Sequence, residues 1–246
     1  MSEDSPTAAV LIIGDEILSG RTKDANLGII AEWASVMGLD LREARVVSDI
    51  EDDIVAAVNA LRQRYTYVFT TGGIGPTHDD ITADAVGKAF GLPVRHDPEA
   101  VRILKDHFAR MGREANEARM RMARMPEGAV LIENAVSRAP GFRVENVFVM
   151  AGIPKVMTAM LESISKMIEP GRPMLSESVT VEATEGDIAG PLKDIQARHG
   201  PVMIGCYPRQ TDKGFCATIV VRSRDQAALA AAMAEVHTLA ERLGRA

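Results

Sequence analysis

Three glycines stand in the stretch GGIGPTHDD, residues 72–80, directly after the β-forming residues 67–71 and before a segment with helical periodicity. Glycine adopts positive φ and has no Cβ, so such a turn brings backbone N–H groups close to a ligand. The helix that follows directs unsatisfied N–H groups and partial positive charge to the same place, which suits phosphate or pyrophosphate. We therefore predict a phosphate site that uses the amides from Gly73 to Thr77. Its candidate ligand-binding residues are Gly72, Gly73, Ile74, Gly75, Pro76, Thr77 and Thr82.

Two aspartates, Asp79 and Asp80, end this stretch. They would repel a phosphate unless a divalent cation bridged them, and Mg²⁺ commonly binds through one or two carboxylates plus substrate phosphates. Asp15 and Glu16 follow another expected strand, residues 8–13, and open α/β sheets bind ligands beyond the carboxyl ends of their strands. We predict that these four carboxylates hold Mg²⁺, Mn²⁺ or Co²⁺, and that Asp79 and Asp80 are the candidate catalytic residues. A simpler alternative is that one of these aspartates caps the helix and the glycines form an ordinary turn.

The elements that would position these residues follow a regular order. Apolar runs at about 8–13, 41–47 and 67–71 read as strands. Each is followed by a segment with apolar residues at helical spacing: Asp24 to Gly38, Glu51 to Arg64, and Asp79 to Gly91. Residues 14–20 read as a loop. Successive strand and helix units predict right-handed crossovers and an α/β fold with a mostly parallel sheet between two helical layers.

The next part of the chain is rich in arginine. Helical patterns at about 98–111 and 114–124 carry a clear excess of basic over acidic residues. This excess fits a solvated helical face, or a flap that brings arginine to an anionic ligand or to a second subunit. Residues 142–150 then read as a hairpin around a two-residue turn, and residues 151–154 lead into another helix.

The proline- and glycine-rich residues 169–173 predict a domain boundary, with domains at 1–170 and 171–246. The second domain reads as β-α-β-β-α, with strands at 178–183, 202–207 and 215–222 and helices at 188–198 and 225–243. The layout looks like a KH-type domain, but its charge is balanced and it has no GXXG loop, which argues against RNA. We expect a structural or oligomer-forming role.

Composition limits the function classes. The chain has 246 residues, of which 46% are hydrophobic, and a formal net charge of −6. An acidic protein is a poor general partner for nucleic acid or an anionic membrane, so we expect neither. The first residues lack the basic and apolar regions of a signal peptide, which predicts a cytoplasmic protein. Cys206 would pair with Ile219 across a hairpin, not with Cys216, so we expect no disulfide. No Cys/His spacing indicates zinc.

The chain resembles the N-terminal family of CinA, the competence/damage-inducible protein A, within the molybdopterin-binding superfamily of MoaB, MogA and MoeA. The C-terminal domain looks like the KH-type middle domain of CinA proteins, through Tyr207-Pro208 and Lys213-Gly214-Phe215. The resemblance of the first domain rests on Gly14-Asp15-Glu16-Ile17-Leu18 with Gly20 and Asn26, on residues 72–85, on Asn116 ahead of Met125-Pro126-Glu127-Gly128, on Pro140-Gly141 and on Gly152-Ile153-Pro154.

The resemblance implies a function. Relatives bind or adenylylate molybdopterin, CinA-type members are similar to metal-dependent pyrophosphatases acting on ADP-ribose, and the same domain in FAD synthetase is associated with FAD hydrolysis. We therefore expect a divalent-metal-dependent hydrolase that cleaves a diphosphate of the ADP-ribose or FAD class and forms a dimer or trimer. The alternatives are a molybdopterin-binding protein of molybdenum cofactor biosynthesis and a non-catalytic binding or assembly module. Further candidate ligand-binding residues are Ser19, Asn26, Asp49, Asn116 and Gly152.

Two departures from CinA stand out. CinA proteins usually carry a C-terminal amidase domain, and this chain ends at Ala246 without room for it, so that activity is expected to be absent. Where CinA has a Pro-Gly-Pro-Pro turn followed by glutamate, residues 151–156 read Ala-Gly-Ile-Pro-Lys-Val. This form resembles the FAD-synthetase-associated domain more closely.

Overall fold

The computed structural model describes residues 5–211 and 214–244. Within this part, the chain divides into two compact units, one up to Gly171 and one from Arg172 onward. Each unit has its own buried core. The boundary predicted from the sequence lies after residue 170, one residue before the boundary between these two units.

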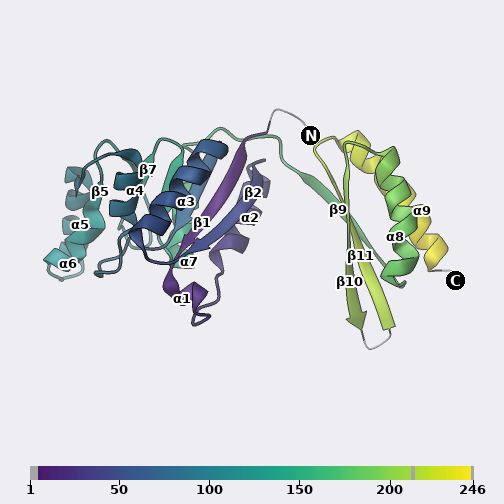
Figure 1. Cartoon of the computed structure of the whole chain (residues 1–246), viewed down its shortest axis with the longest axis horizontal. Coiled ribbons are helices and arrows are strands. Elements are labelled where there is room, and N and C mark those ends of the chain that lie inside the picture. Colours follow the sequence, from purple (N-terminus) through teal and green to yellow (C-terminus); the bar gives the residue numbers. More distant parts are fainter. Residues whose placement is uncertain (1–4, 212–213, 245–246) are drawn as a thin grey trace. The chain divides into compact units, whose positions relative to one another are not determined.

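The N-terminal unit contains a six-stranded sheet in the order β2-β1-β3-β8-β7-β6 (Figure 1). Four strands are parallel: β1 (Thr7–Ile13), β2 (Asp40–Val47), β3 (Tyr67–Thr71) and β8 (Val147–Met150). β7 (Gly141–Val144) and β6 (Val130–Ile132) are antiparallel to their neighbours. The predicted mostly parallel sheet is confirmed. Because β2 and β3 lie on opposite sides of β1, the strand order reverses there, and ligands bind at such reversals.

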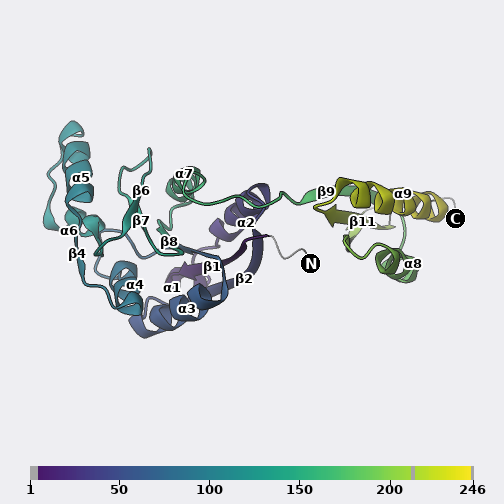
Figure 2. The ribbon, with the colours of Figure 1, turned by 90° about the horizontal axis from the view of Figure 1, so that it is seen from above.

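Helices cover both faces of this sheet, which confirms the predicted three-layer fold (Figure 2). α2 (Asn26–Val36) and α7 (Pro154–Ile164) pack on one face, and α3 (Glu51–Arg64) and α4 (Thr82–Phe90) pack on the other. Alternate residues of β1 enter the two cores, since successive strand side chains point to opposite faces. β1 is apolar and buried from Ala8 to Ile13, as expected for a strand covered on both sides.

The segment after α4 differs from expectation. β4 (Val94–His96) pairs with β5 (Arg124–Pro126), and α5 (Pro98–Arg110) belongs to the segment that connects these two strands along the chain. The helix predicted over about 114–124 forms only in part. It is reduced to one turn of α6 (Glu117–Met120) and a short 3₁₀ helix, η1 (Arg121–Ala123), because the chain must extend into β5. The loop predicted at 14–20 likewise contains a short helix, α1 (Asp15–Leu18).

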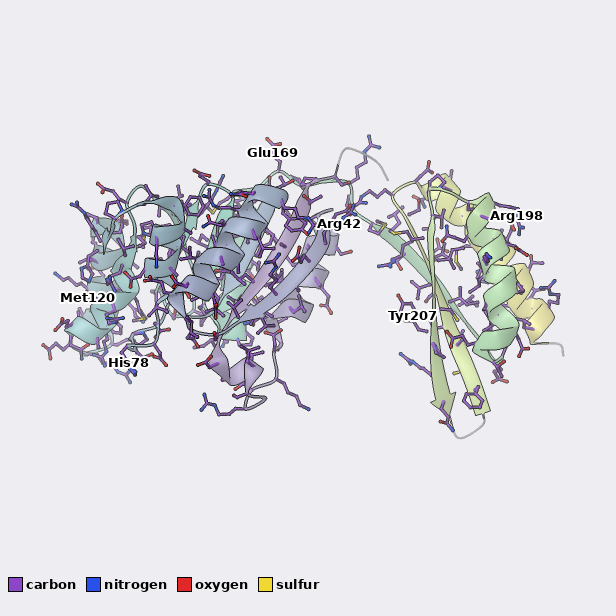
Figure 3. All side chains as sticks on the ribbon, in the orientation of Figure 1. Arg42, His78, Met120, Glu169, Arg198 and Tyr207 are labelled. Carbon is purple, nitrogen blue, oxygen red and sulfur yellow. The ribbon has the colours of Figure 1, made fainter. Side chains whose placement is uncertain are left out.

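The C-terminal unit has the predicted β-α-β-β-α order. It comprises β9 (Leu175–Val181), α8 (Glu185–Arg198), β10 (Met203–Thr211), β11 (Gly214–Ser223) and α9 (Gln226–Leu243). The antiparallel sheet has the order β10-β11-β9, and Tyr207 lies on the face that the helices leave open (Figure 3). Cys206 pairs with Ile219, as predicted, and both cysteines are free thiols. Residues 212–213 of the predicted turn lie outside the described residues.

None of the helices in the described part of the chain is both long enough and apolar enough to cross a membrane.

Candidate functional site

The carboxyl ends of the four parallel strands meet at one edge of the N-terminal sheet. Hydrogen bonds join the segments that leave them: the Gly14 amide donates to the carbonyl of Val47 at 3.1 Å, and the Gly72 amide donates to the carbonyl of Met150 at 3.1 Å. The glycine turn, the acidic segment after β1 and the Gly152 turn are thus brought together, as a parallel sheet requires.

The glycine turn depends on glycine at its first two positions. Gly72 and Gly73 have φ values of 104° and 66°. A methyl group on Gly72 would lie 2.1 Å from the carbonyl oxygen of Ile13, and one on Gly73 would lie 2.1 Å from Oγ1 of Thr82. Side chains other than glycine's are therefore excluded by both conformation and space.

Thr82 holds this turn from inside. Its side chain is fully buried, its hydroxyl donates to the Gly72 carbonyl at 3.0 Å, and its amide donates to the Gly73 carbonyl at 3.0 Å. Thr82 was a candidate ligand-binding residue, but its hydroxyl is already used by the turn. Its contribution is to fix the turn's shape.

Neither Asp79 nor Asp80 caps α4, which begins at Thr82 and has no side-chain cap. The predicted helix start at Asp79 is therefore wrong by three residues, and so is the capping alternative. Asp80 instead closes the turn: its Oδ2 accepts from the Thr77 amide at 2.8 Å and from the Thr77 hydroxyl at 2.6 Å. Because of this hydrogen bond the Thr77 amide is not available to a phosphate, and Pro76 has no N–H. Between Gly73 and Gly75, however, no amide donates to any acceptor in the described chain.

Asp79 is exposed and ionises readily. The Thr77 side chain, the backbone amide of Asp79 itself and the nearby His78 all lower the pKa of the Asp79 carboxyl. The Thr77 hydroxyl has one proton, which it donates to Oδ2 of Asp80 in a hydrogen bond of 2.6 Å. Asp79 is the more exposed aspartate of this pair, whereas Asp80 lines the pocket beside the glycine turn.

Asp49 links the acidic segments. Its Oδ2 accepts from the Asp15 amide at 2.9 Å. Burial raises the pKa of the Asp49 carboxyl, and the charges of Asp15, Glu16 and Asp79 raise it further against that hydrogen bond. The Asp49 carboxyl is therefore near the acidic groups of the segments that follow β1 and β3. The Glu16 carboxylate folds back over Gly14, where a methyl group would lie 2.6 Å from either oxygen.

The fit to a metal ion is partial. Across residues 5–211 and 214–244, no three His, Cys, Asp or Glu side chains are arranged to hold one. The predicted set of Asp15, Glu16, Asp79 and Asp80 is therefore not a ready-made cage, and Asp80 is engaged by Thr77. Mg²⁺ often takes only one or two carboxylates and completes its shell with phosphate and water. The mutual repulsion felt by Asp49 fits a cation of this kind, bound together with a phosphate ligand.

Asn26 braces the edge from α2. Only 5% of the residue is exposed, and its Nδ2 donates to the Gly152 carbonyl at 2.8 Å. Its Oδ1 is buried and has no partner in the described chain. Gly152 in turn packs against Gly72, since a methyl group on Gly152 would lie 3.4 Å from the Gly72 Cα. Both predicted residues therefore belong to the same edge as the glycine turn.

The other two predicted residues differ in position. Ser19 follows α1, and its hydroxyl lies 3.4 Å from the Glu16 carbonyl, so it stands beside the acidic segment. Asn116 caps α6 through a hydrogen bond from the Arg119 amide at 3.0 Å. No hydrogen bond within the described chain joins Asn116 to the glycine turn, and its observed role is to start α6.

Sequence reasoning did not single out two arginines that lie beside the glycine turn. A small pocket of about 10 Å³ is lined by Gly73, Ile74, Gly75, Asp80, Ala83, Arg121, Met122, Arg124 and Phe142. The only signal for this was the basic excess over 98–124. The basic excess was interpreted as either a solvated helical face or a source of arginine for an anionic ligand. Arg102 fits the first, because it pairs with Glu99 and Asp106 on the surface. Arg121 and Arg124 lie beside the glycine turn and fit the second.

Comparison with known proteins identifies the family of the N-terminal unit. Residues 9–170 match the family described as probable molybdopterin binding domain. The chain belongs to this family. A second match, to the middle domain of FAD synthase, covers residues 173–243.

Relatives place the chain in the CinA-like part of this molybdopterin-binding family. A CinA-like protein of Desulfosudis oleivorans is 38% identical over 160 residues, which cover 63% of this chain and 39% of that protein. The crystal structure of CinA from Thermoplasma acidophilum, a protein described as of unknown function, is 33% identical with a TM-score of 0.61, covering 66% of this chain and 98% of that one. A protein of Pyrobaculum calidifontis is 33% identical over 83% of this chain and 81% of its own length.

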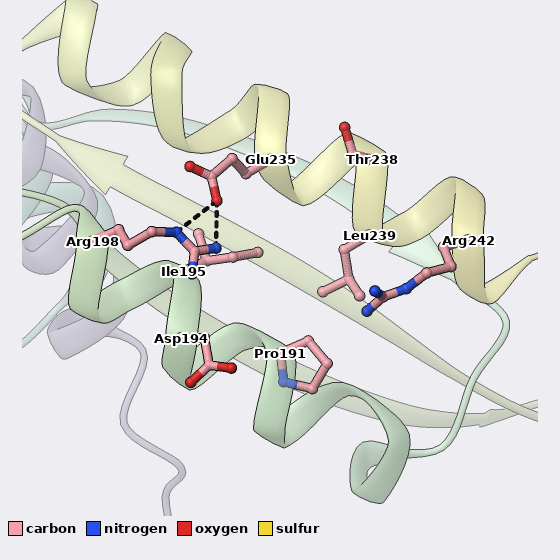
Figure 4. Close-up of a pocket in the computed structure, with 8 residues that line it drawn as sticks. All are labelled: Pro191, Asp194, Ile195, Arg198, Glu235, Thr238, Leu239 and Arg242. Atoms are coloured by element: carbon pink, nitrogen blue, oxygen red, sulfur yellow. Dashed lines mark hydrogen bonds and ion pairs between the residues drawn. The ribbon is translucent and has the colours of Figure 1, made fainter.

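A second hollow belongs to the C-terminal unit. It is a groove of about 330 Å³ between α8 and α9 (Figure 4). Two of its charged residues, Arg198 and Glu235, form an ion pair at 2.6 Å. No residue predicted to bind a ligand lies there. The glycine turn, although its pocket is much smaller, is the place where the predicted chemistry converges.

Proposed function

We propose that this CinA-like, molybdopterin-binding-fold protein is a divalent-metal-dependent pyrophosphatase that cleaves a dinucleotide-type diphosphate of the ADP-ribose or FAD class. The observation that carries the proposal is the glycine turn, whose amides at Gly73, Ile74 and Gly75 donate to no acceptor in the described chain, at the same sheet edge as Asp49, which binds the Asp15 amide. The first feature suits a phosphate, and the second suits the cation that would accompany it.

The ligand's diphosphate would lie on the amides of Gly73, Ile74 and Gly75. These amides are held in place by Thr82 and by the positive φ of Gly72 and Gly73, so they are oriented before the ligand arrives. Preorganised donors of this kind stabilise charge that develops on phosphoryl oxygens during cleavage. The sequence predicted that all amides from Gly73 to Thr77 bind the phosphate. The structure leaves only the amides of Gly73, Ile74 and Gly75 for this role, because the Thr77 amide donates to Asp80.

One or two of the carboxylates of Asp79, Asp15 and Asp49 would hold the cation, and the phosphate and water would complete its shell. When bound, a divalent cation polarises a phosphoryl oxygen and lowers the pKa of a bound water. Asp79 stays ionised because of its lowered pKa, so it can position a cation or accept a hydrogen bond from the attacking water. Asp80 acts through the turn that it closes.

Turnover is the test. The full chain would be incubated with ADP-ribose, FAD or NAD, each with Mg²⁺, Mn²⁺ or Co²⁺, and the release of AMP would be measured by chromatography. We expect cleavage of ADP-ribose or FAD that stops when the metal is chelated. If no combination yields AMP, the pyrophosphatase proposal fails.

A pair of variants tests the role of Asp79. Asp79→Asn should lower kcat by about 100-fold or more if the carboxylate acts on the reacting groups, while ligand affinity changes much less. Glu162→Gln is the matched control, because Glu162 is an exposed carboxylate on α7. If Asp79→Asn weakens binding as much as it lowers the rate, Asp79 only positions the ligand.

The second candidate function is molybdopterin binding in molybdenum cofactor biosynthesis, which the family match over residues 9–170 favours. The same glycine turn would then hold the pterin's phosphate. Titration with molybdopterin and with adenylylated molybdopterin tests this function, and absence of binding to both would exclude it. Ligand binding without metal uptake or turnover would favour a non-catalytic binding module.

A further inference from the structure

Charge at this sheet edge is mostly negative, because five acidic residues lie on the segments that follow β1, β2 and β3: Asp15, Glu16, Asp49, Asp79 and Asp80. A diphosphate that binds here needs positive charge from the protein as well as from a cation. We propose that Arg121 supplies it, by contacting the phosphate group that lies on the glycine turn. The proposal rests on the proposed function only in requiring that the ligand carries phosphate, not that it is cleaved.

Arg121 lies where such a contact is needed. It begins η1 and lines the pocket together with Gly73, Ile74 and Gly75, whose amides donate to no acceptor in the described chain. The Nε–H of Arg121 is buried and likewise donates to no acceptor among the described residues. Buried donors are nearly always paired, so one left over beside a ligand site marks a contact that the ligand or an ordered water completes.

Arg121 differs from the neighbouring arginines Arg119 and Arg124, because the guanidinium groups of both already bind other residues. Arg124 binds both carboxylate oxygens of Asp84, at 2.6 and 3.1 Å. Arg119 stacks over the Phe108 ring at 4.9 Å and donates to the Glu114 carbonyl. The side chain of Arg121 has no ion pair, hydrogen bond or ring contact with any described residue.

The backbone fixes the position of Arg121 from both sides. Asn116 caps α6 on the N-terminal side. On the C-terminal side, Ala123 is fully buried, and its carbonyl accepts from the Asp97 amide at 2.9 Å before β5 pairs with β4. Arg121 is therefore held over the turn by the same chain reversal that shortened the helix predicted at 114–124.

The pocket also limits what Arg121 can contact. At about 10 Å³ it has room for roughly one water, so a phosphate group must lie at its mouth. A guanidinium offers two parallel N–H donors that match two oxygens of one phosphate. Arg121 and the glycine amides would then face the same phosphate from two directions. This arrangement favours nucleotides with a diphosphate over phosphate-free nucleosides or rings.

The test measures binding. Wild type and the variants Arg121→Gln, Arg121→Lys and Arg113→Gln would be titrated by calorimetry with ADP-ribose, inorganic pyrophosphate and adenosine, each with Mg²⁺. Arg113 is an exposed arginine of the same segment outside the pocket, so Arg113→Gln removes equal charge without touching the turn. Thermal unfolding without ligand checks that each variant is folded.

We expect Arg121→Gln to weaken ADP-ribose and pyrophosphate binding by about tenfold or more, as loss of a charge-assisted contact predicts. Arg121→Lys should restore part of this affinity, and adenosine binding should not change. Equal affinity of Arg121→Gln and wild type for ADP-ribose would overturn the proposal. So would an equal loss in Arg113→Gln, or failure of wild type to bind both ADP-ribose and pyrophosphate.

Turnover separates this proposal from the pyrophosphatase function. If wild type binds ADP-ribose through Arg121 without releasing AMP, the function fails and the assignment of Arg121 stands. If wild type releases AMP and Arg121→Gln has the same KM and kcat, the function stands and the assignment of Arg121 is overturned.

Discussion

Replacement of Gly72 by alanine should destabilise the N-terminal unit much more than an ordinary glycine substitution. The φ of 104° costs an L-residue about 1–2 kcal/mol. The added methyl group would lie 2.1 Å from the Ile13 carbonyl oxygen, which belongs to a buried strand and cannot swing aside. Crowding of this kind typically costs a further 1–3 kcal/mol or so, which gives about 2–5 kcal/mol in total.

Two other glycines separate these contributions. Gly20 has φ of 72° and nothing within 4 Å of an added methyl group, so Gly20→Ala should show the conformational cost alone, about 1–2 kcal/mol. Gly152 has no positive φ, and a methyl group there would meet Gly72 Cα at an ordinary 3.4 Å. Gly152→Ala should therefore change stability by less than about 0.5 kcal/mol.

Urea unfolding followed by tryptophan fluorescence measures these differences. Trp33 is the single tryptophan of the chain. It packs edge-on against Phe69 at 5.1 Å and donates to the Ser165 hydroxyl at 2.9 Å, so it reports on the N-terminal unit. If Gly72→Ala is no more destabilising than Gly20→Ala, the argument that space forces glycine into the turn is refuted.

Two further variants test the surroundings of the turn. Thr82→Val removes the hydroxyl that donates to the Gly72 carbonyl and should cost about 1–2 kcal/mol in the same urea assay, whereas Thr82→Ser should retain most of the stability. For Asp49, the folded-state pKa is raised above 3.8, so wild type loses stability as pH rises from about 3.8 through the folded pKa, and the penalty persists above it. Asp49→Asn should therefore have the higher Tm at pH 7, with the difference vanishing near pH 3, and Mg²⁺ should raise the Tm of wild type more than that of the variant. A Tm difference that is independent of pH would contradict the inferred repulsion.

Much of the fold follows from local patterns that are long and regular. The apolar residues of β1 and the helical spacing of α3 each had enough repeats to define an element, and both were predicted within a residue of their observed bounds. β4, β5 and α6 have three or four residues each. Such short elements show no period, and tertiary pairing decides them. The helix predicted at 114–124 forms only over residues 117–123, because the chain extends at Arg124 to pair β5 with β4.

The site divides in the same way. The glycine turn and the acidic residues after β1 were predictable because strand ends of a parallel sheet meet at one edge, whatever the details of the side chains. The engagement of Asp80 by Thr77 and the burial of the Thr82 hydroxyl depend on local geometry that spacing alone does not give. Arg121 was hidden for a further reason: about fifty residues separate it from the turn, and only the path through η1 and β5 brings them together.

The central claim is that the edge formed by the glycine turn and the acidic loops binds a phosphate ligand together with a divalent cation. A crystal structure of the full chain soaked with ADP-ribose and Mg²⁺ tests it most directly. We predict that the diphosphate lies on the amides of Gly73, Ile74 and Gly75, with the cation between it and the carboxylates of Asp79, Asp15 or Asp49. Binding of ADP-ribose elsewhere, for example in the groove between α8 and α9, with this edge empty, would contradict the account.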